Sequence, residues 1–367
     1  MEARRMVSQP ASQTRKSWVR RQQPDRSQLI RHAVQASFLL LNAWIGILFY
    51  RWVRSFEQGG SGMAQPVDAR PAGVDGWLPI AGLMHTKFLF LTGHLPVIHP
   101  AALFLFLAFV AISLLLKRAF CSWLCPVGTL SEALWHLGQW IFGRTLRLPR
   151  WLDIPLRSLK YLLLGLFVVL IGSMSALALE QFMQTPYGLI VDVRMLNFFR
   201  FMSLTSAIVM VAIGLLSLGI QNFWCRYLCP YGALLGLVAT LSPVKIRRET
   251  SACIACGKCA RHCPSHLPVD KLVQIRSAEC TACMECVAVC PAQDALQLAL
   301  PAHRTSRQTP QWSGRQLHPA TVAAVIALLF LSAVAWAHWT HHWQTELPRT
   351  VYQQLIPEAN FLSHPGL

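Results

Sequence analysis

All twelve cysteines of this 367-residue chain lie in short motifs whose spacing suits metal ligands. Eight of them form two runs of the pattern Cys-x2-Cys-x2-Cys-x3-Cys-Pro, at 253–264 and 280–291. The other four form two pairs of the pattern Cys-x3-Cys-Pro, at 121–126 and 225–230. Grouped thiolates at such spacing bind iron–sulfur clusters, which exchange single electrons. The cysteines therefore predict a protein that moves electrons.

The two long runs predict two [4Fe–4S] clusters with crossed ligands. In the bacterial form of this run, three close cysteines bind one cluster and the fourth binds the other. We therefore assign one cluster to Cys253, Cys256, Cys259 and Cys290. The second cluster is assigned to Cys280, Cys283, Cys286 and Cys263. Two zinc sites or a disulfide knot would not require a duplicated spacing in which both runs end in Cys-Pro.

The two short pairs belong to an internal repeat. Residues 120–130 align with residues 224–234 without a gap, and they share an aromatic residue, both cysteines, the proline and a glycine. A pseudo-two-fold relation would bring Cys121 and Cys125 together with Cys225 and Cys229. Four thiolates around one centre suit a third iron–sulfur cluster, a single iron or a zinc ion. Two redox-active dithiols, or small buried residues with a structural or maturation role, are the alternatives.

Long uncharged stretches predict helices that cross a membrane. The chain is 54% hydrophobic and only 13% charged. About 20 apolar residues in a helix span the hydrocarbon layer. We expect transmembrane helices near 33–50, 101–116, 161–179, 201–220 and 319–339. The predicted fold is mainly α-helical: a polytopic bundle of about five transmembrane helices, including two repeated hairpins, with a bacterial-type 2[4Fe–4S] ferredoxin module.

These elements divide the chain into segments. We expect a basic extension at 1–32, a membrane domain at 33–240, the ferredoxin module at 245–300, a polar linker at 301–318 and an outer tail at 340–367. The segment 78–98 is apolar but is interrupted by prolines, histidines and a lysine. A sixth span there would reverse the orientation of everything that follows it. We therefore expect an interfacial or re-entrant segment.

The net charge of +17 predicts orientation rather than a nucleic-acid partner. Of the 33 Lys and Arg residues, 26 fall in three segments, 1–32, 117–160 and 221–318. Five spans would place these segments on one side, and the positive-inside rule assigns that side to the cytoplasm. We expect a protein of the bacterial inner membrane with its N-terminus and clusters cytoplasmic and its C-terminus periplasmic. The basic residues would then contact anionic lipid headgroups.

Histidines near the opposite side could serve a quinol site. A quinol needs a proton acceptor beside an apolar surface, and ionisable groups at membrane depth are functional candidates. His85 and His94 lie in the apolar segment 78–98 and meet this requirement. Their alternative role is that of surface or interface-anchoring histidines.

The motifs resemble a known family. Phe120–Glu132 and Phe223–Gly236 resemble the paired elements of the NosR/NirI/NapH-type membrane polyferredoxins, and 253–291 resembles the cluster module of that family. The sequence of Trp224–Pro230 is most similar to that of the NosR/NirI branch. The resemblance covers residues 85–295 and implies electron transfer across or along the cytoplasmic membrane in support of a respiratory reductase. The length of the chain fits a short, NapH-like, quinol-linked member.

We therefore expect an electron-transfer protein that connects the quinone pool to a respiratory redox partner. The chain has no Gly-rich nucleotide fingerprint, catalytic triad or flavin-attachment pattern, so we assign no catalytic residue. It would act as a subunit of an oxidoreductase system without a substrate pocket of its own. One alternative is an assembly factor that reduces a metal or thiol for a partner metalloenzyme, as in CcoG-like relatives. Another is a membrane scaffold with structural clusters.

Overall fold

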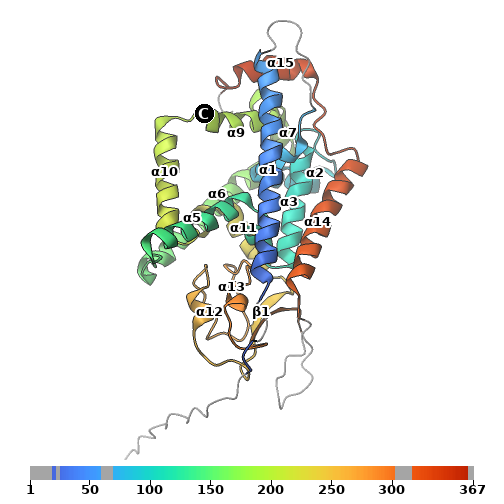
Figure 1. The fold of residues 1–367 in the computed structure, drawn as a ribbon. Helices are drawn as coiled ribbons and strands as arrows, with labels where there is room; N and C mark the ends of the chain where they lie inside the picture. Colours follow the sequence, from blue (N-terminus) through green and yellow to red (C-terminus); the bar gives the residue numbers. More distant parts are fainter. Residues whose placement is uncertain (1–18, 22–24, 59–68, 302–315, 363–367) are drawn as a thin grey trace, which may run out of the picture.

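The fold is a bundle of helices with a small cysteine-rich module at one end (Figure 1). The computed structural model describes residues 19–21, 25–58, 69–301 and 316–362. The expected extension 1–32 and linker 301–318 therefore lie largely outside the described residues. Five helices extend between the module end and the opposite end: α1 (Ser27–Gln58), α3 (Pro100–Leu115), α6 (Arg150–Ser173), α10 (Leu204–Gly219) and α14 (Pro319–Trp339).

Several of these helices can cross a membrane. In the described part of the chain, α1, residues 151–173 of α6, and α14 are long and apolar enough for a span. Helix α10 forms a fourth candidate together with α9 (Val191–Arg200), although the two are bent by 80°. Helix α3 has only 16 residues and counts as a short apolar helix. The structure thus gives three to four candidate spans where the sequence predicted about five.

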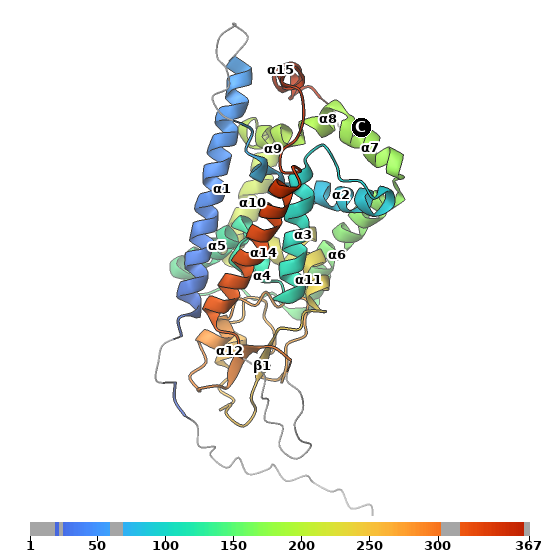
Figure 2. The ribbon, with the colours of Figure 1, turned by 90° about the vertical axis from the view of Figure 1, so that its right-hand side faces the viewer.

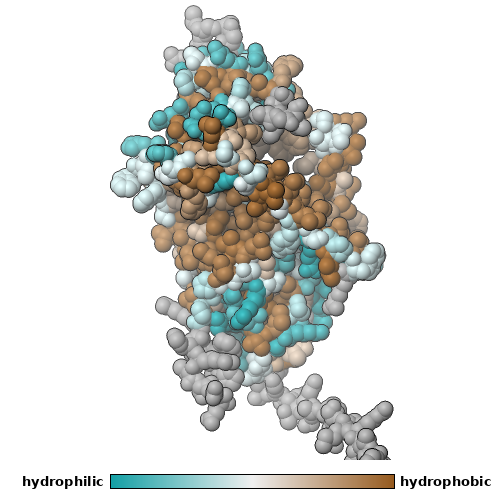
Figure 3. All heavy atoms as spheres, turned by 180° about the vertical axis from the view of Figure 1, so that it is seen from behind, coloured by the Kyte–Doolittle hydropathy of each residue, from teal (hydrophilic) through white to brown (hydrophobic). Residues whose placement is uncertain are grey.

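Burial explains the different character of these helices. Helix α3 is apolar on all sides because α2 (Pro79–Thr92), α11 (Pro230–Ala239) and α14 pack around it. Helices α1 and α6 instead leave large apolar side chains exposed along their length. Exposed apolar residues form a belt around the middle of the molecule, and hydrophilic residues gather toward both ends (Figure 3). This distribution is that of a membrane protein.

Proline fixes where several helices begin. Helices α2, α3, α11, α14 and α5 (Pro126–Phe142) each have proline in the first turn, where its missing N–H costs nothing. The short helix α4 (Ala119–Trp123) precedes α5, and the π-helical turn η2 (Trp224–Leu228) precedes α11. Each Cys-x3-Cys pair therefore crosses a break between two helical segments and does not lie on one continuous helix.

Helix ends differ from the hydrophobic runs for identifiable reasons. Helix α1 extends beyond 33–50 at both ends, because Arg31 is paired inside the protein and the polar segment after Tyr50 continues the helix. Helix α6 stops at Ser173 rather than near 179. The ammonium of Lys87 donates to the carbonyls of Ile171, Gly172 and Met174, which are left free at that end.

The end opposite the module is built from short helices. These are η1 (Ala72–Trp77), α2, α7 (Ala176–Gln184), α8 (Pro186–Leu189), α9 and α15 (Arg349–Glu358). Helix α2 accounts for most of the segment 78–98, has 14 residues and is not among the candidate spans. It lies across the direction of α3 and α14 (Figure 2).

The module contains one small sheet. Strands β1 (Lys245–Arg248) and β2 (Leu296–Ala299) are antiparallel, with Lys245 opposite Ala299. The short helices α12 (Lys258–Arg261) and α13 (Glu285–Ala288) lie within the two cysteine runs. Residues 19–21 pair with residues 291–293, so the chain before α1 is held against the module.

Candidate metal centres and the histidine cavity

The eight cysteines of the module surround two separate cavities. The first thiol cavity is lined by Cys253, Cys256, Cys259 and Cys290. The second thiol cavity is lined by Cys263, Cys280, Cys283 and Cys286. Each cavity thus receives three cysteines from one run and the fourth from the other run. This crossed grouping has the ligand number and pattern that two [4Fe–4S] clusters require.

The backbone around the two cavities follows a repeated pattern. Ala255 and Ala282 occupy equivalent positions in the two runs and have φ of 55° and 53°. Gly257 and Met284 are likewise equivalent, with φ of 68° and 60°. Left-handed residues between right-handed ones form concave turns whose N–H groups suit an anion. Met284 adopts this conformation although a methionine at positive φ gives no sequence signal.

The two thiol cavities differ in their distance from solvent. Cys256 of the first cavity is exposed, whereas Cys263, Cys280 and Cys286 of the second cavity are buried. Cys283 is half-buried. The second cavity therefore faces the helical domain, and the first lies toward the outside of the module.

The four paired cysteines come together at the junction of the two domains. Cys121 lies in α4 and Cys225 in η2, while Cys125 and Cys229 cap the starts of α5 and α11. The thiol of Cys225 interacts electrostatically with each of the other three. The four paired cysteines therefore lie near one another in the folded chain.

Glycine occupies the matching position of each repeat, and at position 128 the close packing requires it. A Cβ on Gly128 would lie 2.2 Å from the carbonyl oxygen of Cys121. A Cβ on Gly232 would lie 3.5 Å from Sγ of Cys229, and the N–H of Gly232 donates to that Sγ at 3.2 Å. The start of α11 therefore offers a backbone donor to a thiol, which stabilises the thiolate form.

Burial and a cation act in opposite directions on these thiols. Burial raises the pKa of Cys121 to about 11 and that of Cys125 to about 12. The buried guanidinium of Arg118 lowers the pKa values of Cys121 and Cys229 in part. Without a metal the four thiols are therefore protonated at neutral pH, and binding a metal would release their protons.

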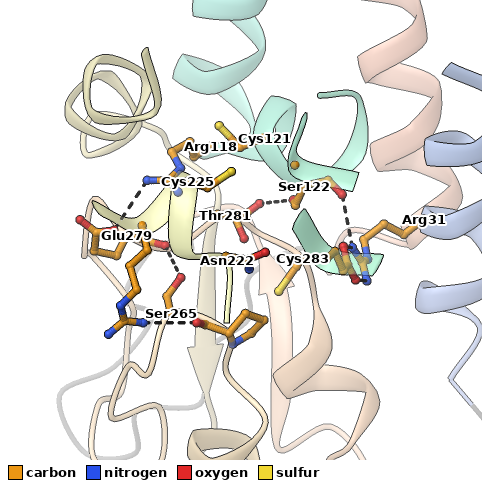
Figure 4. A pocket seen from close by; sticks show the side chains of 14 residues that line it. Arg31, Arg118, Cys121, Ser122, Asn222, Cys225, Ser265, Glu279, Thr281 and Cys283 are labelled. Atoms are coloured by element: carbon orange, nitrogen blue, oxygen red, sulfur yellow. Dashed lines mark hydrogen bonds and ion pairs between the residues drawn. The ribbon is translucent and has the colours of Figure 1, made fainter. Parts of the chain in front are cut away.

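A pocket connects the paired cysteines with the second thiol cavity. Figure 4 shows Cys121 and Cys225 on one side of this pocket and Cys283 on the other. The hydroxyl of Ser122 donates to the carbonyl of Thr281 at 2.6 Å, and Nε1 of Trp123 donates to the carbonyl of Ala282 at 3.2 Å. The segment that holds one pair is thus hydrogen-bonded directly to the loop that precedes Cys283.

Buried ion pairs surround the same junction. Arg31 binds Glu132 through both nitrogens, at 2.5 and 2.6 Å. The carboxylate of Glu279 accepts from Lys160 at 2.7 Å and lies 3.8 Å from Arg118. Burial alone would raise the pKa of Glu279, but these cations outweigh it and lower the pKa. The thiols therefore lie in a cation-rich and largely dehydrated setting.

The histidines at the opposite end are placed differently from one another. A cavity of about 220 Å³, here called the histidine cavity, is lined by His85, His99 and apolar side chains from η1, α2, α7, α8 and α9. His85 is 1% exposed and His99 is 2% exposed. His94, the other sequence candidate, is exposed at the end of α2 and does not line the cavity.

A buried charged group lies beside the histidine cavity. Arg70 contacts Asp75 and Asp192, and Nδ1 of His99 lies 3.0 Å from Oδ1 of Asp75. The hydroxyl of Thr345 joins this group from the C-terminal segment. Sequence reasoning missed this set, because Asp192 lies 122 residues after Arg70 in the chain. Their only local signal was the presence of charged residues among apolar ones.

Comparisons with known proteins agree with these sites. Residues 245–291 match the family model described as a 4Fe-4S dicluster domain. Residues 98–145 and 200–249 match the model described as a 4Fe-4S binding domain, and these two stretches contain the paired cysteines. The chain carries iron–sulfur binding domains in both its module and its helical part.

Curated proteins that are similar to this chain include one named for electron transport and one named as ferredoxin-type. YccM of Escherichia coli strain K12, a protein named for a role in electron transport, is 48% identical over 91% of both chains. NirI of Paracoccus denitrificans is 32% identical over 44% of this chain and 23% of its own length. The ferredoxin-type protein NapH of E. coli is 29% identical over 40% of this chain and 48% of its own length.

No solved structure matches this chain significantly. The family models and the relatives nevertheless agree on iron–sulfur domains, and the helices are those of a membrane protein. The chain therefore belongs to the NosR/NirI/NapH-type family of membrane polyferredoxins.

Proposed function

We propose that this chain relays electrons between the quinone pool of the bacterial inner membrane and a redox partner protein. The observation that carries the proposal is the crossed grouping of eight cysteines around two cavities, next to a further four cysteines at the helical domain. Two [4Fe–4S] clusters in these cavities would accept and release single electrons. The protein supplies their ligands, their cationic surroundings and their spacing.

The exposure of the cysteines supports an order for the path. The second thiol cavity is buried against the helical domain. We call the cluster site there the inner station, because it is the one nearer to the helical domain. The first thiol cavity includes the exposed Cys256, so it is the outer station, from which electrons leave or enter. Arg261 donates to the carbonyl of Cys256 at 3.1 Å, and Lys258 lies on the same short helix, α12. Cations there favour a partner with an acidic surface.

The four paired cysteines are proposed to hold a third metal centre. Their mutual proximity, the backbone donor from Gly232 and the neighbouring guanidinium of Arg118 all favour a bound anionic thiolate centre. Simple packing cysteines would not require these partners. The hydrogen bonds from Ser122 and Trp123 would then join this centre to the inner station.

Aromatic rings connect the paired cysteines with the histidine cavity. Helix α2, which forms one wall of the cavity, packs closely on Phe106, since a Cβ on Gly82 would lie 2.6 Å from Cβ of Phe106. The ring of Phe106 stacks on Tyr231 at 5.8 Å. Tyr231 lies among Cys121, Cys125 and Cys229 in the buried interior. We propose that the cavity is the quinone site and that these rings lie on the route to the metal centres.

The distribution of basic residues supports an orientation. The described parts of the three segments rich in Lys and Arg lie at the module end or lead into it. We propose that this end is cytoplasmic and that the histidine cavity lies toward the periplasm. Fusions of alkaline phosphatase and of green fluorescent protein to the C-terminus test this. An active phosphatase and a dark fluorescent protein are expected, and the reverse result would refute the orientation.

Chemical analysis tests the metal content. Purified protein should contain about eight iron and eight sulfide per chain for two clusters, and about twelve of each with a third. Reduction by dithionite should produce paramagnetic signals from interacting clusters. Protein that folds and functions with iron far below two clusters would refute the proposal.

Alanine variants separate the third centre from the other two. Cys225→Ala should remove the third centre and leave the two module clusters, whereas Cys286→Ala should affect the inner station. Ser217→Ala, a buried position on α10 outside all three groups, is the control. If Cys225→Ala keeps every iron and every signal of the wild type, the paired cysteines hold no metal.

A further inference from the structure

The histidine cavity contains polar atoms with no partner, although it is otherwise apolar. Among the described residues, Nδ1 of His85, Nε2 of His99 and Oδ2 of Asp75 have no hydrogen-bond partner and are buried. Leaving such atoms unpaired in the interior is unfavourable. His85 and His99 line the cavity and Asp75 contacts His99, so the two histidines indicate a ligand that can supply the missing hydrogen bonds.

The size and lining of the cavity define the class of that ligand. Trp77, Ile80, Met84, Phe182 and Met183 contribute apolar surface. An apolar cavity of ~150 Å³ accepts a benzene ring, and this cavity, at about 220 Å³, can accept a substituted ring. Two histidines at its wall suit oxygen atoms on that ring. An aromatic ring with hydroxyl groups, as in a quinol, meets both conditions.

Two buried groups contact the same ring nitrogen of His99. Nδ1 lies 3.0 Å from Oδ1 of Asp75 and 3.0 Å from Nη2 of Arg70. The carboxylate of Asp75 is ionised, because Arg70 and His99 lower its pKa to about 2 against the opposing effect of burial. We assign the ring proton to Nδ1, where Asp75 accepts its hydrogen bond. With the proton on Nδ1, the lone pair of Nε2 is free to accept another proton. A carboxylate that holds the tautomer of a histidine in this way is a known device for general-base catalysis.

The second histidine is suited to a different role. Burial lowers the pKa of His85 to about 3, with a further contribution from His99, so His85 is neutral at physiological pH. A neutral imidazole binds a ring oxygen through a hydrogen bond without taking its proton. His85 is therefore a positioning group.

We propose that His99, oriented by Asp75, is the base that takes the hydroxyl protons of a quinol bound in the histidine cavity. This inference rests on the proposed function, because the two electrons of the quinol pass singly to the iron–sulfur centres. Each oxidation breaks two O–H bonds and gives a quinone, two electrons and two protons. The protons leave one after the other through Nε2 of His99. Asp75 and Asp192 share one guanidinium, that of Arg70, beside His99.

Two measurements on the intact protein test this assignment. Duroquinol is mixed with oxidised protein, and bleaching of the iron–sulfur absorption gives the rate of reduction. A fluorescent hydroxyquinoline N-oxide, a quinol analogue, gives the dissociation constant from its quenching. The variants are His99→Gln and Asp75→Asn, with His94→Gln as the matched control, because His94 is exposed and outside the cavity.

We expect His99→Gln to slow reduction by duroquinol by about 100-fold or more, as loss of a general base does. Asp75→Asn should slow it by at least about tenfold, because the tautomer is no longer held. Analogue binding should weaken less than about tenfold in both variants, since the cavity remains. Dithionite should reduce all proteins alike, and His94→Gln should match the wild type.

A cavity-filling variant keeps the test decisive if the polar variants fold poorly. Ala81 lines the cavity, and Ala81→Phe should abolish both analogue binding and reduction by duroquinol while dithionite still reduces the clusters. Reduction of His99→Gln by duroquinol at the wild-type rate would overturn this inference alone. Reduction of Ala81→Phe at the wild-type rate would overturn it together with the assignment of the cavity as the quinone site. If duroquinol fails to reduce the wild type that dithionite reduces, the proposed relay itself is wrong.

Discussion

The two ends of the molecule bury charge in opposite ways. At the thiol end, among the described residues, one carboxylate is buried, Asp153, and Glu132 and Glu279 are half-buried. The buried cations there are more numerous: Arg31, Lys117, Arg118, Lys160, Arg226 and Arg247. At the histidine end, Arg70 is shared by Asp75 and Asp192, which leaves an excess of negative charge. Surplus cations favour bound anions, and a surplus of carboxylate favours a proton on a neighbouring base.

This difference matches the proposed chemistry of the two ends, which is electron transfer at the thiol end and proton transfer at the histidine end. Four thiolates around a metal centre are anionic, and buried guanidinium groups offset that charge. A histidine that accepts a proton becomes cationic, and nearby carboxylates offset that charge instead. The comparison leads to four predictions, which concern the two ends and the connection between them.

The largest effect is expected at Arg70. Arg70→Gln leaves two buried carboxylates without their cation, which should lower the free energy of unfolding by about 3–5 kcal/mol. Thermal or denaturant unfolding in detergent measures this loss. The iron–sulfur absorption of protein that remains folded should be unchanged, because Arg70 is at the far end.

A second substitution checks the cause of that loss. The double variant Arg70→Gln/Asp192→Asn should recover part of the stability, because one unpaired carboxylate is removed with the guanidinium. A coupling of about 1–3 kcal/mol is expected for groups in direct contact. Strictly additive effects would mean that Asp192 and Arg70 do not share their charge.

Removing a cation at the thiol end should have a more specific effect. Arg118→Gln removes a charge beside the paired cysteines and weakens hydrogen bonds to Gly232 and Ala278. We expect a loss of about 1.5–3 kcal/mol, typical of hydrogen bonds to charged groups, together with loss of iron from the third centre. Arg144→Gln, in the exposed segment that follows α5, is the control and should keep wild-type iron.

The third prediction concerns pH at the histidine end. The pKa of His85 is about 3 in the folded protein and near 6.5 when unfolded. Between these values the unfolded chain binds a proton that the folded protein does not, so stability falls as the pH is lowered below 6.5. The slope should be about 1.4 kcal/mol per pH unit from this group. Melting curves at pH 7 and pH 5.5 should show it in the wild type and in His94→Gln, and a reduced slope in His85→Gln.

The smallest effect is expected where the two ends are joined. Phe106→Leu keeps an apolar side chain of similar size and should cost about 1 kcal/mol. It removes the ring that stacks on Tyr231, so reduction by duroquinol should slow severalfold while analogue binding is unchanged. An unaltered rate would show that electrons do not depend on this ring.

The cysteine motifs could be predicted from the sequence because ligand spacing is local. Each run of cysteines lies within a dozen residues, and the crossing of the fourth ligand follows from that spacing. The family assignment and the iron–sulfur domains are confirmed by the comparisons. The ligand sets themselves, the quinone site and the orientation stay predictions.

The histidine end could not be predicted in the same way. His94 and His99 are five residues apart in similar surroundings, and only the fold sends one to the surface and the other into the cavity. Asp75 and Asp192 meet through Arg70, but they are 117 residues apart in the chain. Local hydropathy also misplaced helix ends, because Lys87 and Arg31 find partners in distant segments.

The bonds from Ser122 and Trp123 to the loop before Cys283 fix the module to the bundle. Transfer between the helical domain and the inner station then involves no diffusional encounter between separate bodies. Its rate should be insensitive to ionic strength, whereas delivery from the exposed side to a soluble acidic protein should slow as salt screens the attraction. Salt would thus distinguish the internal step from the external one within a single molecule.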